Sequence, residues 1–313
     1  MLGRAFRRVR YKVSDLLLQK NPAKIAGLQK WSIGMYVGSS PLQLLPSSQI
    51  KNPVLTAEDV SDCRAALVAD PFMINVADRW HMFFEVFNLD SGKGEIGWAT
   101  STNAKNWTYQ HIVLAEPFHM SYPYVFEWKN DYYMIPETVR AGTLRLYKAF
   151  NFPTLWSLVG ILRRGRLADP SVVRYQDKWW LFAETNPEIT CDTLRLYSAD
   201  DLLGPWREHP SSPIIKDNPH IARPAGRVLS LDGRLLRFTQ DCFPDYGIAV
   251  RAFSITELTS TTYRETPCSE EPLLHSSGKG WNKSGMHHVD PHCTGEGQWI
   301  ACVDGSFFVN KKS

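Results

Sequence analysis

One short pattern of residues recurs along the chain, and this repeat limits the possible folds more than any other feature. In its three clearest copies, a proline is followed 14 residues later by a glutamate that ends an aromatic-rich segment. Two weaker copies follow toward the C-terminus. The copies are Pro71 to Glu85, Pro123 to Glu137, Pro170 to Glu184, Arg223-Pro224 to Asp241, and Asp290-Pro291 to Asp304. Five copies of one unit indicate a repeat architecture.

Each unit contains short segments rich in β-forming residues, separated by turn residues. Successive repeat prolines are 47 to 67 residues apart. Units of about 40–50 residues with four antiparallel strands are typical of propeller blades. A β-sandwich is the alternative, but a sandwich has no reason to repeat the same side chains in every unit. We therefore predict an all-β fold, a five-bladed β-propeller with four-stranded antiparallel blades.

The fifth unit is too short to complete a blade. The 22 residues after Pro291 suffice for two strands and a short tail, so the missing outer strand must come from elsewhere. Ser32–Gly38 is rich in β-formers and belongs to no repeat, whereas the prolines and serines of residues 41–48 predict a loop. We predict that Ser32–Gly38 pairs with the second strand of blade five, so that an N-terminal strand closes the ring.

Charge divides the chain into a basic N-terminal arm, residues 1–30, and a single propeller domain, residues 31–313. The arm holds eight Lys or Arg against one Asp, a net charge of +7, whereas the whole chain is +3 and the remainder is therefore −4. The arm is suited to peripheral contact with an anionic membrane, and a solvated tail is the alternative. Since the propeller is not basic, we expect no nucleic-acid partner.

Neither an export signal nor a cofactor motif is evident. No apolar run approaches the roughly 20 residues that span a bilayer, and no signal-peptide core precedes a cleavage site. We expect a cytoplasmic protein, with peripheral membrane attachment through the arm left open. The six cysteines are scattered without a Cys-x-x-Cys motif, which indicates reduced thiols rather than zinc or redox chemistry. We expect no cofactor.

Propeller geometry predicts where the repeated polar residues meet. The first strand of a blade begins, and the antiparallel second strand ends, at the same rim of the central channel. We therefore expect one polar, concave mouth, the kind of place where small molecules bind. Its residues would be Asp70, Tyr122, Asp169, Arg223 and His288 from the first strands and Glu85, Glu137, Glu184, Asp241 and Asp304 from the second.

Paired carboxyl groups at such a mouth suit glycosidic chemistry. One carboxylic acid protonates the leaving oxygen, while a carboxylate activates water or attacks the sugar. Crowded like charges raise one pKa and so separate the acid from the base. The alternative for the three repeated glutamates is structural, because a residue present in several blades also suits hydrogen bonds from one blade to the next.

The positions where the repeat breaks are more informative than those where it holds. Tyr122 and Arg223 replace the Asp of blades one and three. Arg223 suits a substrate phosphate or carboxylate, or lowers the pKa of a neighbouring Asp, and a salt bridge inside the channel is the alternative. The candidate substrate-binding residues are Tyr122, Arg223, His288, Asp290, Glu85 and Asp241.

A metal trio is a minor alternative in blade five. His288, Asp290 and His292 alternate along one strand and so share a face. On a straight strand they would spread over about 13 Å, too far for one ion, unless Pro291 bends the chain. We therefore expect no metal site.

The Asp-Pro pattern followed by an aromatic strand ending in Glu resembles the five-bladed propeller glycosidases of the arabinanase and xylosidase type and the related fructosidases. In that clan, one Asp acts as base, a second Asp tunes a pKa and a Glu acts as acid. The resemblance implies that Asp70 is the base and Asp169 the tuning residue, with either Glu137 or Glu184 as the acid.

A closer resemblance covers residues 31–305. Its segments include Trp31-Ser32-Ile33-Gly34, Val68-Ala69-Asp70-Pro71-Phe72, Ser121-Tyr122-Pro123-Tyr124, Met134-Ile135-Pro136-Glu137-Thr138, Arg223-Pro224-Ala225-Gly226 and Gln240-Asp241-Cys242. They are similar to the N-terminal propeller of plant glucosamine inositolphosphorylceramide transferases. In those proteins, a separate C-terminal glycosyltransferase domain carries the transferase motifs, so the resemblance implies a family rather than an activity.

These observations together favour a carbohydrate-active propeller. We expect it to cleave or transfer a glycosyl or sugar-phosphate group of a carbohydrate or glycoconjugate substrate, with Asp70, Asp169 and Glu137 or Glu184 as the catalytic carboxyls. The alternative is a non-catalytic glycan-binding or scaffold module for glycoconjugate biosynthesis.

Overall fold

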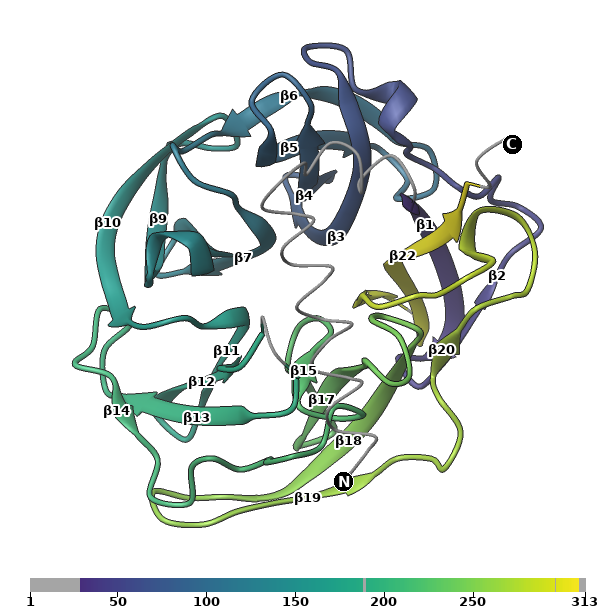
Figure 1. The fold of residues 1–313 in the computed structure, drawn as a ribbon. Helices are drawn as coiled ribbons and strands as arrows, with labels where there is room; N and C mark the ends of the chain where they lie inside the picture. The colour runs from purple at the N-terminus through teal and green to yellow at the C-terminus, as the bar shows by residue number, and fades with distance from the viewer. Residues whose placement is uncertain (1–28, 188–189, 296, 310–313) are drawn as a thin grey trace.

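The fold is described from a computed structural model over residues 29–187, 190–295 and 297–309. The basic arm, apart from its last two residues, lies outside this range, so its proposed membrane contact stays a prediction. Five antiparallel sheets surround a common centre, which confirms the five-bladed β-propeller (Figure 1). Within the described range, no helix is long and apolar enough to cross a membrane.

Each of the first three blades is one run of four consecutive strands. Blade one comprises β3 (Ala65–Val76), β4 (Arg79–Asn88), β5 (Lys93–Ser101) and β6 (Thr108–Leu114). Blade two comprises β7 (Ser121–Trp128), β8 (Asp131–Glu137), β9 (Thr143–Asn151) and β10 (Leu155–Arg164). Blade three comprises β11 (Ala168–Tyr175), β12 (Lys178–Glu184), β13 (Leu194–Ala199) and β14 (Arg207–Glu208).

Blade four is less regular. Its main path is β15 (Arg223–Pro224), β17 (Arg234–Asp241), β18 (Ala249–Leu258) and β19 (Tyr263–Pro267). Two short strands, β16 (Leu229–Leu231) and β20 (Leu274–His275), pair beside this path. Short 3₁₀ turns at Ala57–Asp59, Val139–Ala141 and Gly280–Asn282 connect blades or strands.

Blade five confirms the predicted ring closure. Its inner strands are β21 (Val289–Gly295) and β22 (Gln298–Phe308), and both outer strands come from the N-terminal side of the chain (Figure 1). Strand β1 (Gln29–Ser40) pairs antiparallel with β22 from Gln29 opposite Phe308 to Gly38 opposite Trp299. The predicted loop over residues 41–48 is wrong in part, because β2 (Gln43–Pro46) pairs with β1 as the fourth strand. Turn residues within a short segment do not reveal whether a neighbouring strand is available to pair with that segment.

The hairpins between first and second strands explain why the repeat keeps turn residues at fixed places. Both residues of each turn have positive φ, the backbone of a type I′ turn, which matches the twist of paired strands. Asn, Asp and Gly tolerate this conformation best. The turns are Ala77-Asp78, Lys129-Asn130, Gln176-Asp177 and Asp232-Gly233.

A bulge at the residue before the repeat proline sets the direction of the side chains near the centre. Asp70, Tyr122 and Asp169 have φ of 53°, 47° and 47°, and the strand register shifts at each of them. Proline fits here because the innermost strand is an edge strand, so the missing N–H breaks no ladder hydrogen bond. A non-glycine residue at positive φ costs roughly 1–3 kcal/mol, and such strain is common where side chains are re-aimed at functional sites.

Aromatic and aliphatic side chains fill the space between neighbouring blades. One cluster packs Phe72 and Phe83 of blade one against Tyr124 and Met134 of blade two and continues to Leu181 of blade three. A Trp at or just before the start of the last strand recurs in blades one to three, and it is also structural. Each indole N–H donates to a backbone carbonyl three or four residues earlier, in Trp107, Trp156 and Trp206.

Candidate active site

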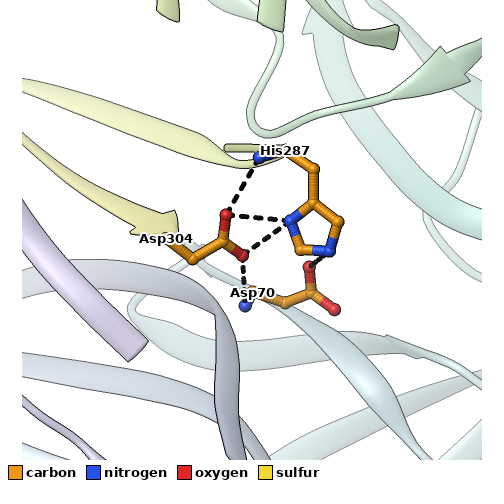
Figure 2. A group of neighbouring side chains, drawn as sticks. All are labelled: Asp70, His287 and Asp304. Carbon is orange, nitrogen blue, oxygen red and sulfur yellow. Dashed lines mark hydrogen bonds and ion pairs between the residues drawn. The ribbon is translucent and has the colours of Figure 1, made fainter. Parts of the chain in front are cut away.

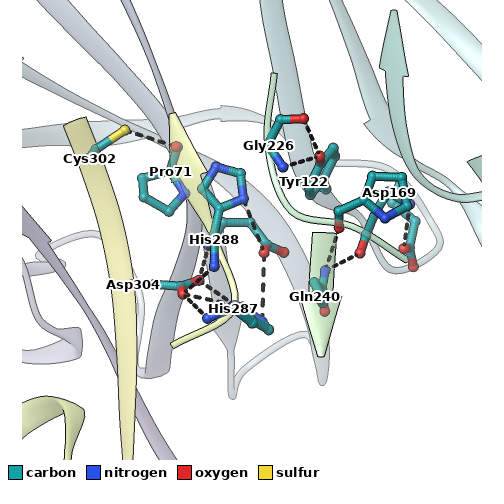
Figure 3. A network of polar contacts seen from close by, with 12 residues as sticks. Pro71, Tyr122, Asp169, Gly226, Gln240, His287, His288, Cys302 and Asp304 are labelled. Atoms are coloured by element: carbon teal, nitrogen blue, oxygen red, sulfur yellow. Dashed lines mark hydrogen bonds and ion pairs between the residues drawn. The ribbon is translucent and has the colours of Figure 1, made fainter. Parts of the chain in front are cut away.

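Asp304, at the inner end of blade five, organises the centre of the ring. Its carboxylate accepts the backbone N–H of Asp70 at 3.1 Å and of His287 at 3.1 Å, and it bonds Nδ1 of His287 at 2.7 Å (Figure 2). It also accepts the backbone N–H of His288 at 3.0 Å (Figure 3). Burial by itself would raise the pKa of Asp304, but the charge and hydrogen bond of His287 outweigh it and lower the pKa. Asp304 is therefore ionised, and its hydrogen bonds link blade five to blade one.

Asp70 lies beside Asp304, and one of its two carboxyl oxygens accepts no hydrogen bond from the described residues. Oδ1 is buried and has no hydrogen-bond partner among the described residues. The nearest ring nitrogens are Nε2 of His287 at 3.8 Å and Nδ1 of His288 at 3.9 Å. Burial raises the pKa of Asp70 to about 7; His287 opposes this rise, while Asp169 and Asp304 add to it. Asp70 thus changes its protonation state near neutral pH.

His287 is a site residue that the sequence analysis missed. Its ring stacks on Trp31 at 4.0 Å between centroids and meets the edge of Tyr246 at 5.3 Å. The sequence indicates a special position here only through the doubled His287-His288. Because the predicted inner strand begins at His288, the prediction includes the second histidine and not the first. His288 is instead fully buried against Phe72, and burial lowers its pKa to about 4.

On the opposite side of the centre, the carboxylate of Asp169 accepts hydrogen bonds from one arginine and one glutamine side chain. Arg223 donates from Nε to Oδ2 at 2.6 Å and from one terminal nitrogen to Oδ1 at 3.3 Å. Gln240 donates to Oδ2 at 2.5 Å (Figure 3). Arg223 thus forms a salt bridge inside the channel, and its proposed contact with a substrate stays a prediction.

Glu137 joins the same group from blade two. Its Oε2 accepts the backbone N–H of Asp169 at 3.2 Å and a hydrogen bond from Arg223 at 3.4 Å. Burial, and then the charge of Asp169, raise the pKa of Glu137 well above its usual value, while Arg223 opposes the rise. Glu137 links two blades, and its surroundings favour the protonated form of its carboxyl group, so the structural and chemical interpretations apply together.

Two further glutamates end second strands near the centre. Glu85 lies 3.4 Å from Nε2 of His119, and burial, followed by Asp70, raises its pKa well above the usual value. Glu184 is fully buried, with Oε1 bonded to the backbone of Asn186 and Thr193 and Oε2 without a partner among the described residues. Burial raises the pKa of Glu184 to about 8.

Because Glu184 is buried, replacing it by Gln should stabilise the folded protein, and this stabilisation should grow as pH rises. A folded-state pKa of about 8 against an unfolded value near 4.5 means that the folded protein loses stability as pH rises through this window. Glutamine carries no charge, so the urea midpoint of the variant relative to the native protein should increase from pH 5 to pH 8. Glu127→Gln, at an exposed carboxylate, is the control and should show no such trend. A difference that stays constant with pH would contradict a buried, titrating Glu184.

Arg223 should be one of the most sensitive side chains in the ring. Arg223→Met leaves Asp169 and Glu137 without their buried cation, and breaking a buried ion pair costs about 3–5 kcal/mol. Arg64→Met removes a solvent-screened pair with Asp90 at the surface and should lower the midpoint only slightly. Urea unfolding at pH 7 measures both. Equal midpoints for the two variants would show that the central pair is not stabilising.

Three other predicted residues have their polar groups engaged by the protein. The Tyr122 hydroxyl donates to the carbonyl of Gly226 at 3.0 Å and accepts its N–H at 2.6 Å (Figure 3). Asp290 binds Arg227 at 2.8 Å, and Asp241 binds His220 at 2.9 Å and Arg251 at 3.2 Å. Their assignment to substrate stays a prediction.

The histidine-aspartate trio considered in blade five does not assemble. His292 bonds Asp290 at 2.9 Å, whereas His288 faces Asp70, because β21 begins only at Val289. A different group, Asp70, His287 and Asp304, has ligand atoms within 4.8 Å of one another. However, four N–H hydrogen bonds already use about the full acceptor capacity of the Asp304 carboxylate. We therefore interpret this group as a hydrogen-bond network.

This fold, with carboxyl groups at its centre, defines the class as five-bladed β-propellers, the architecture of many glycoside hydrolases. The chain superposes on the catalytic domain of a GH62 α-L-arabinofuranosidase from Coprinopsis cinerea with a TM-score of 0.60 at 13% identity, covering 89% of this chain and 97% of that one. A family 117 glycoside hydrolase from Zobellia galactanivorans gives 0.54 at 15% identity, covering 89% and 91%. At such identities the likeness shows the fold alone.

The sequence places the chain more narrowly. Residues 26–306 match the family described as glucosamine inositolphosphorylceramide transferase 1, N-terminal, and the chain belongs to this family. It is 36% identical over 304 residues to glucosamine inositolphosphorylceramide transferase 1 of Oryza sativa subsp. japonica and 33% identical over 298 residues to that of Arabidopsis thaliana. The matches cover 89% and 88% of this chain but only 40% and 39% of the relatives. The resemblance found from sequence motifs is thus confirmed.

Proposed function

We propose that the centre of the ring performs acid–base chemistry on a glycosidic or sugar-phosphate bond, with Asp70 as the base and Glu137 as the acid. The observation that carries this proposal is the different surroundings of the two carboxyl groups. Asp70 has an unbonded oxygen beside His287, whereas Glu137 is hydrogen-bonded to the backbone of Asp169. Environments that hold two carboxyl groups in different protonation states are how one site supplies both an acid and a base.

The roles follow from where each proton is held. Glu137, kept protonated by burial and by the charge of Asp169, gives its proton to the oxygen of the leaving group. Asp70, with a pKa of about 7, removes a proton from water or from the hydroxyl of an accepting sugar. Asp169 acts as the tuning residue. Glu137 is preferred over Glu184 as the acid because its side chain is 13% exposed, whereas Glu184 is fully enclosed.

The names of the relatives supply the substrate class of the proposal. They refer to glucosamine and to an inositol phosphate attached to ceramide. We therefore propose a glycoconjugate headgroup that joins an amino sugar to an inositol phosphate. Because this chain spans about 40% of those relatives, the transferase activity in their name is not carried over to the propeller.

A panel of substrates tests the proposal directly. The protein is incubated at pH 7 with 4-nitrophenyl arabinofuranoside, xyloside, galactoside and glucosaminide, and with glucosaminyl inositol phosphate. Released sugar is then measured by mass spectrometry. Release from at least one substrate, above the rate without protein, is the expected result. No release from any of them after prolonged incubation would overturn the catalytic proposal.

A glycan-binding or scaffold module is the second candidate. It is favoured by the engagement of Asp169, both of whose oxygens accept hydrogen bonds from Arg223 or Gln240. Calorimetric binding of glucosaminyl inositol phosphate without any product would support this candidate over the first.

A further inference from the structure

His287 is held from several sides although it belongs to no repeat of the sequence. Asp304 of β22 fixes Nδ1, Trp31 of β1 covers one ring face, and Tyr246 from the loop before β18 meets it edge-on. Gly247 permits this approach, because a Cβ there would lie 2.9 Å from the Cβ of His287. Three elements from distant parts of the sequence therefore determine the orientation of one imidazole.

This orientation leaves the other ring nitrogen facing Asp70. Since Nδ1 bonds Asp304, Nε2 is the nitrogen that lies 3.8 Å from Oδ1 of Asp70 (Figure 2). That oxygen is buried and has no hydrogen-bond partner in the part of the chain that the structure describes. A shift of about 1 Å would bring the pair to hydrogen-bond distance, roughly 2.8 Å for a charged N–H donor and a carboxylate. The geometry places one imidazole nitrogen beside the proposed base, where a proton on that nitrogen would favour the ionised carboxylate.

We propose that His287, fixed by Asp304 with its second ring nitrogen toward Asp70, is a positioning residue that favours the ionised form of Asp70, and that the ring-closing strand contributes to the site by holding His287 through Trp31. This role rests on the proposed function and extends it, because it assigns a partner residue to the proposed base, Asp70. It also gives ring closure a chemical consequence beyond stability, since Trp31 lies on the strand that closes the ring.

The surrounding charges show why Asp70 needs this partner. Asp169 of β11 and Asp304 of β22 raise the pKa of Asp70. Glu85 of β4 and Glu137 of β8 place two further carboxyl groups at the same centre, and the pKa of each is raised well above its usual value. Against them stand Arg223 of β15, which is committed to Asp169, and His288, which burial keeps neutral above pH 4. After burial itself, His287 has the largest influence on the pKa of Asp70, and it lowers that pKa. Tyr246, the remaining neighbour of His287, has a pKa that burial raises well above its usual value, so it stays neutral.

His287→Gln tests the role by its pH dependence. Glutamine retains a hydrogen-bonding side chain but no charge, so the pKa of Asp70 should rise. The acidic limb of the kcat/KM profile should then move to higher pH by one unit or more, with activity recovering to within a few-fold of the native protein at alkaline pH. A purely structural role would lower activity equally at every pH. His81→Gln, at a buried histidine near the start of β4 that stacks on Trp98, should leave the profile unchanged.

A second measurement needs no substrate, so it separates this proposal from the proposed function. The imidazole of His287 is titrated by ¹⁵N NMR in the native protein, in Asp70→Asn and in Asp304→Asn. If the three groups are coupled, the midpoint of His287 falls in both variants, and it falls further in Asp304→Asn, which removes the hydrogen-bonded carboxylate. An unchanged midpoint in Asp70→Asn would overturn the role of His287. A shifted midpoint together with a failed substrate panel would overturn only the proposed catalysis.

Discussion

Turnover should fall at least 100-fold when Asp70 is replaced by Asn, because a positioned base contributes roughly 10²- to 10⁴-fold to a rate. The amide has nearly the same shape as the carboxyl group but cannot accept the proton from water or a sugar hydroxyl. The measurement is the initial rate of sugar release from whichever substrate of the panel is turned over. A loss of less than tenfold would remove Asp70 from the proposed mechanism.

The same replacement should not weaken the fold. Burial raises the pKa of Asp70 from 3.8 to about 7, so the folded protein loses stability as pH rises through this range. Asn does not ionise, so the variant should not lose stability over this pH range. The melting temperature of the variant should match that of the native protein near pH 4 and equal or exceed it at pH 8.

Asp78→Asn is the matched control for both measurements. Asp78 lies in the exposed turn between the same two strands, where its positive φ suits Asn. It should change neither turnover nor the pH dependence of melting. If Asp78→Asn reduced turnover as much as Asp70→Asn, the effect could not be assigned to the central carboxyl.

Removing residues 1–40 should unfold the propeller or lower its melting temperature sharply, with aggregation. The deletion removes β1, whose Ile33 and Met35 are fully buried and whose Trp31 is nearly so. Burying such side chains contributes about 1.5–3 kcal/mol each, and the total stability of a domain is only about 5–15 kcal/mol. It also opens the edge of β22, and an unpaired edge strand promotes association between chains.

Removing residues 1–28 is the control, because it leaves every described strand in place. Melting is followed by circular dichroism and aggregation by light scattering. Equal melting of the two shortened proteins would show that closure by β1 contributes little to stability.

The features predicted correctly from sequence depend on spacing and counting along the chain. The interval from Pro71 to Glu85, and its copies, reports the length of a two-stranded hairpin, which is a local property. The shortage of residues after Pro291 required a strand from elsewhere, and Ser32–Gly38 had the composition to supply it. Turn chemistry such as Asp232-Gly233 is equally local, since two positive φ angles select the residues.

The second closing strand was missed because its evidence is not local. Gln43–Pro46 follows one proline and ends at another, which reads as a loop in sequence. Its Leu44 becomes buried only because β1, Ala225 and Leu236 lie around it in the folded ring. Burial by residues nearly 200 positions away leaves no trace in a short window of sequence.

The candidate site divides in the same way. The repeat by itself determined that Asp70, Glu137 and Asp169 approach a common centre, because the same interval from proline to glutamate in each blade brings the corresponding strand ends to the same rim. Tertiary structure decided the chemical state of these groups. The tie from Asp304 to the backbone of Asp70 spans 234 positions, and His287 acquires its orientation from Trp31 at the other end of the chain. A pKa depends on distance and burial in space, so only the closed ring determines which of these carboxyl groups holds a proton.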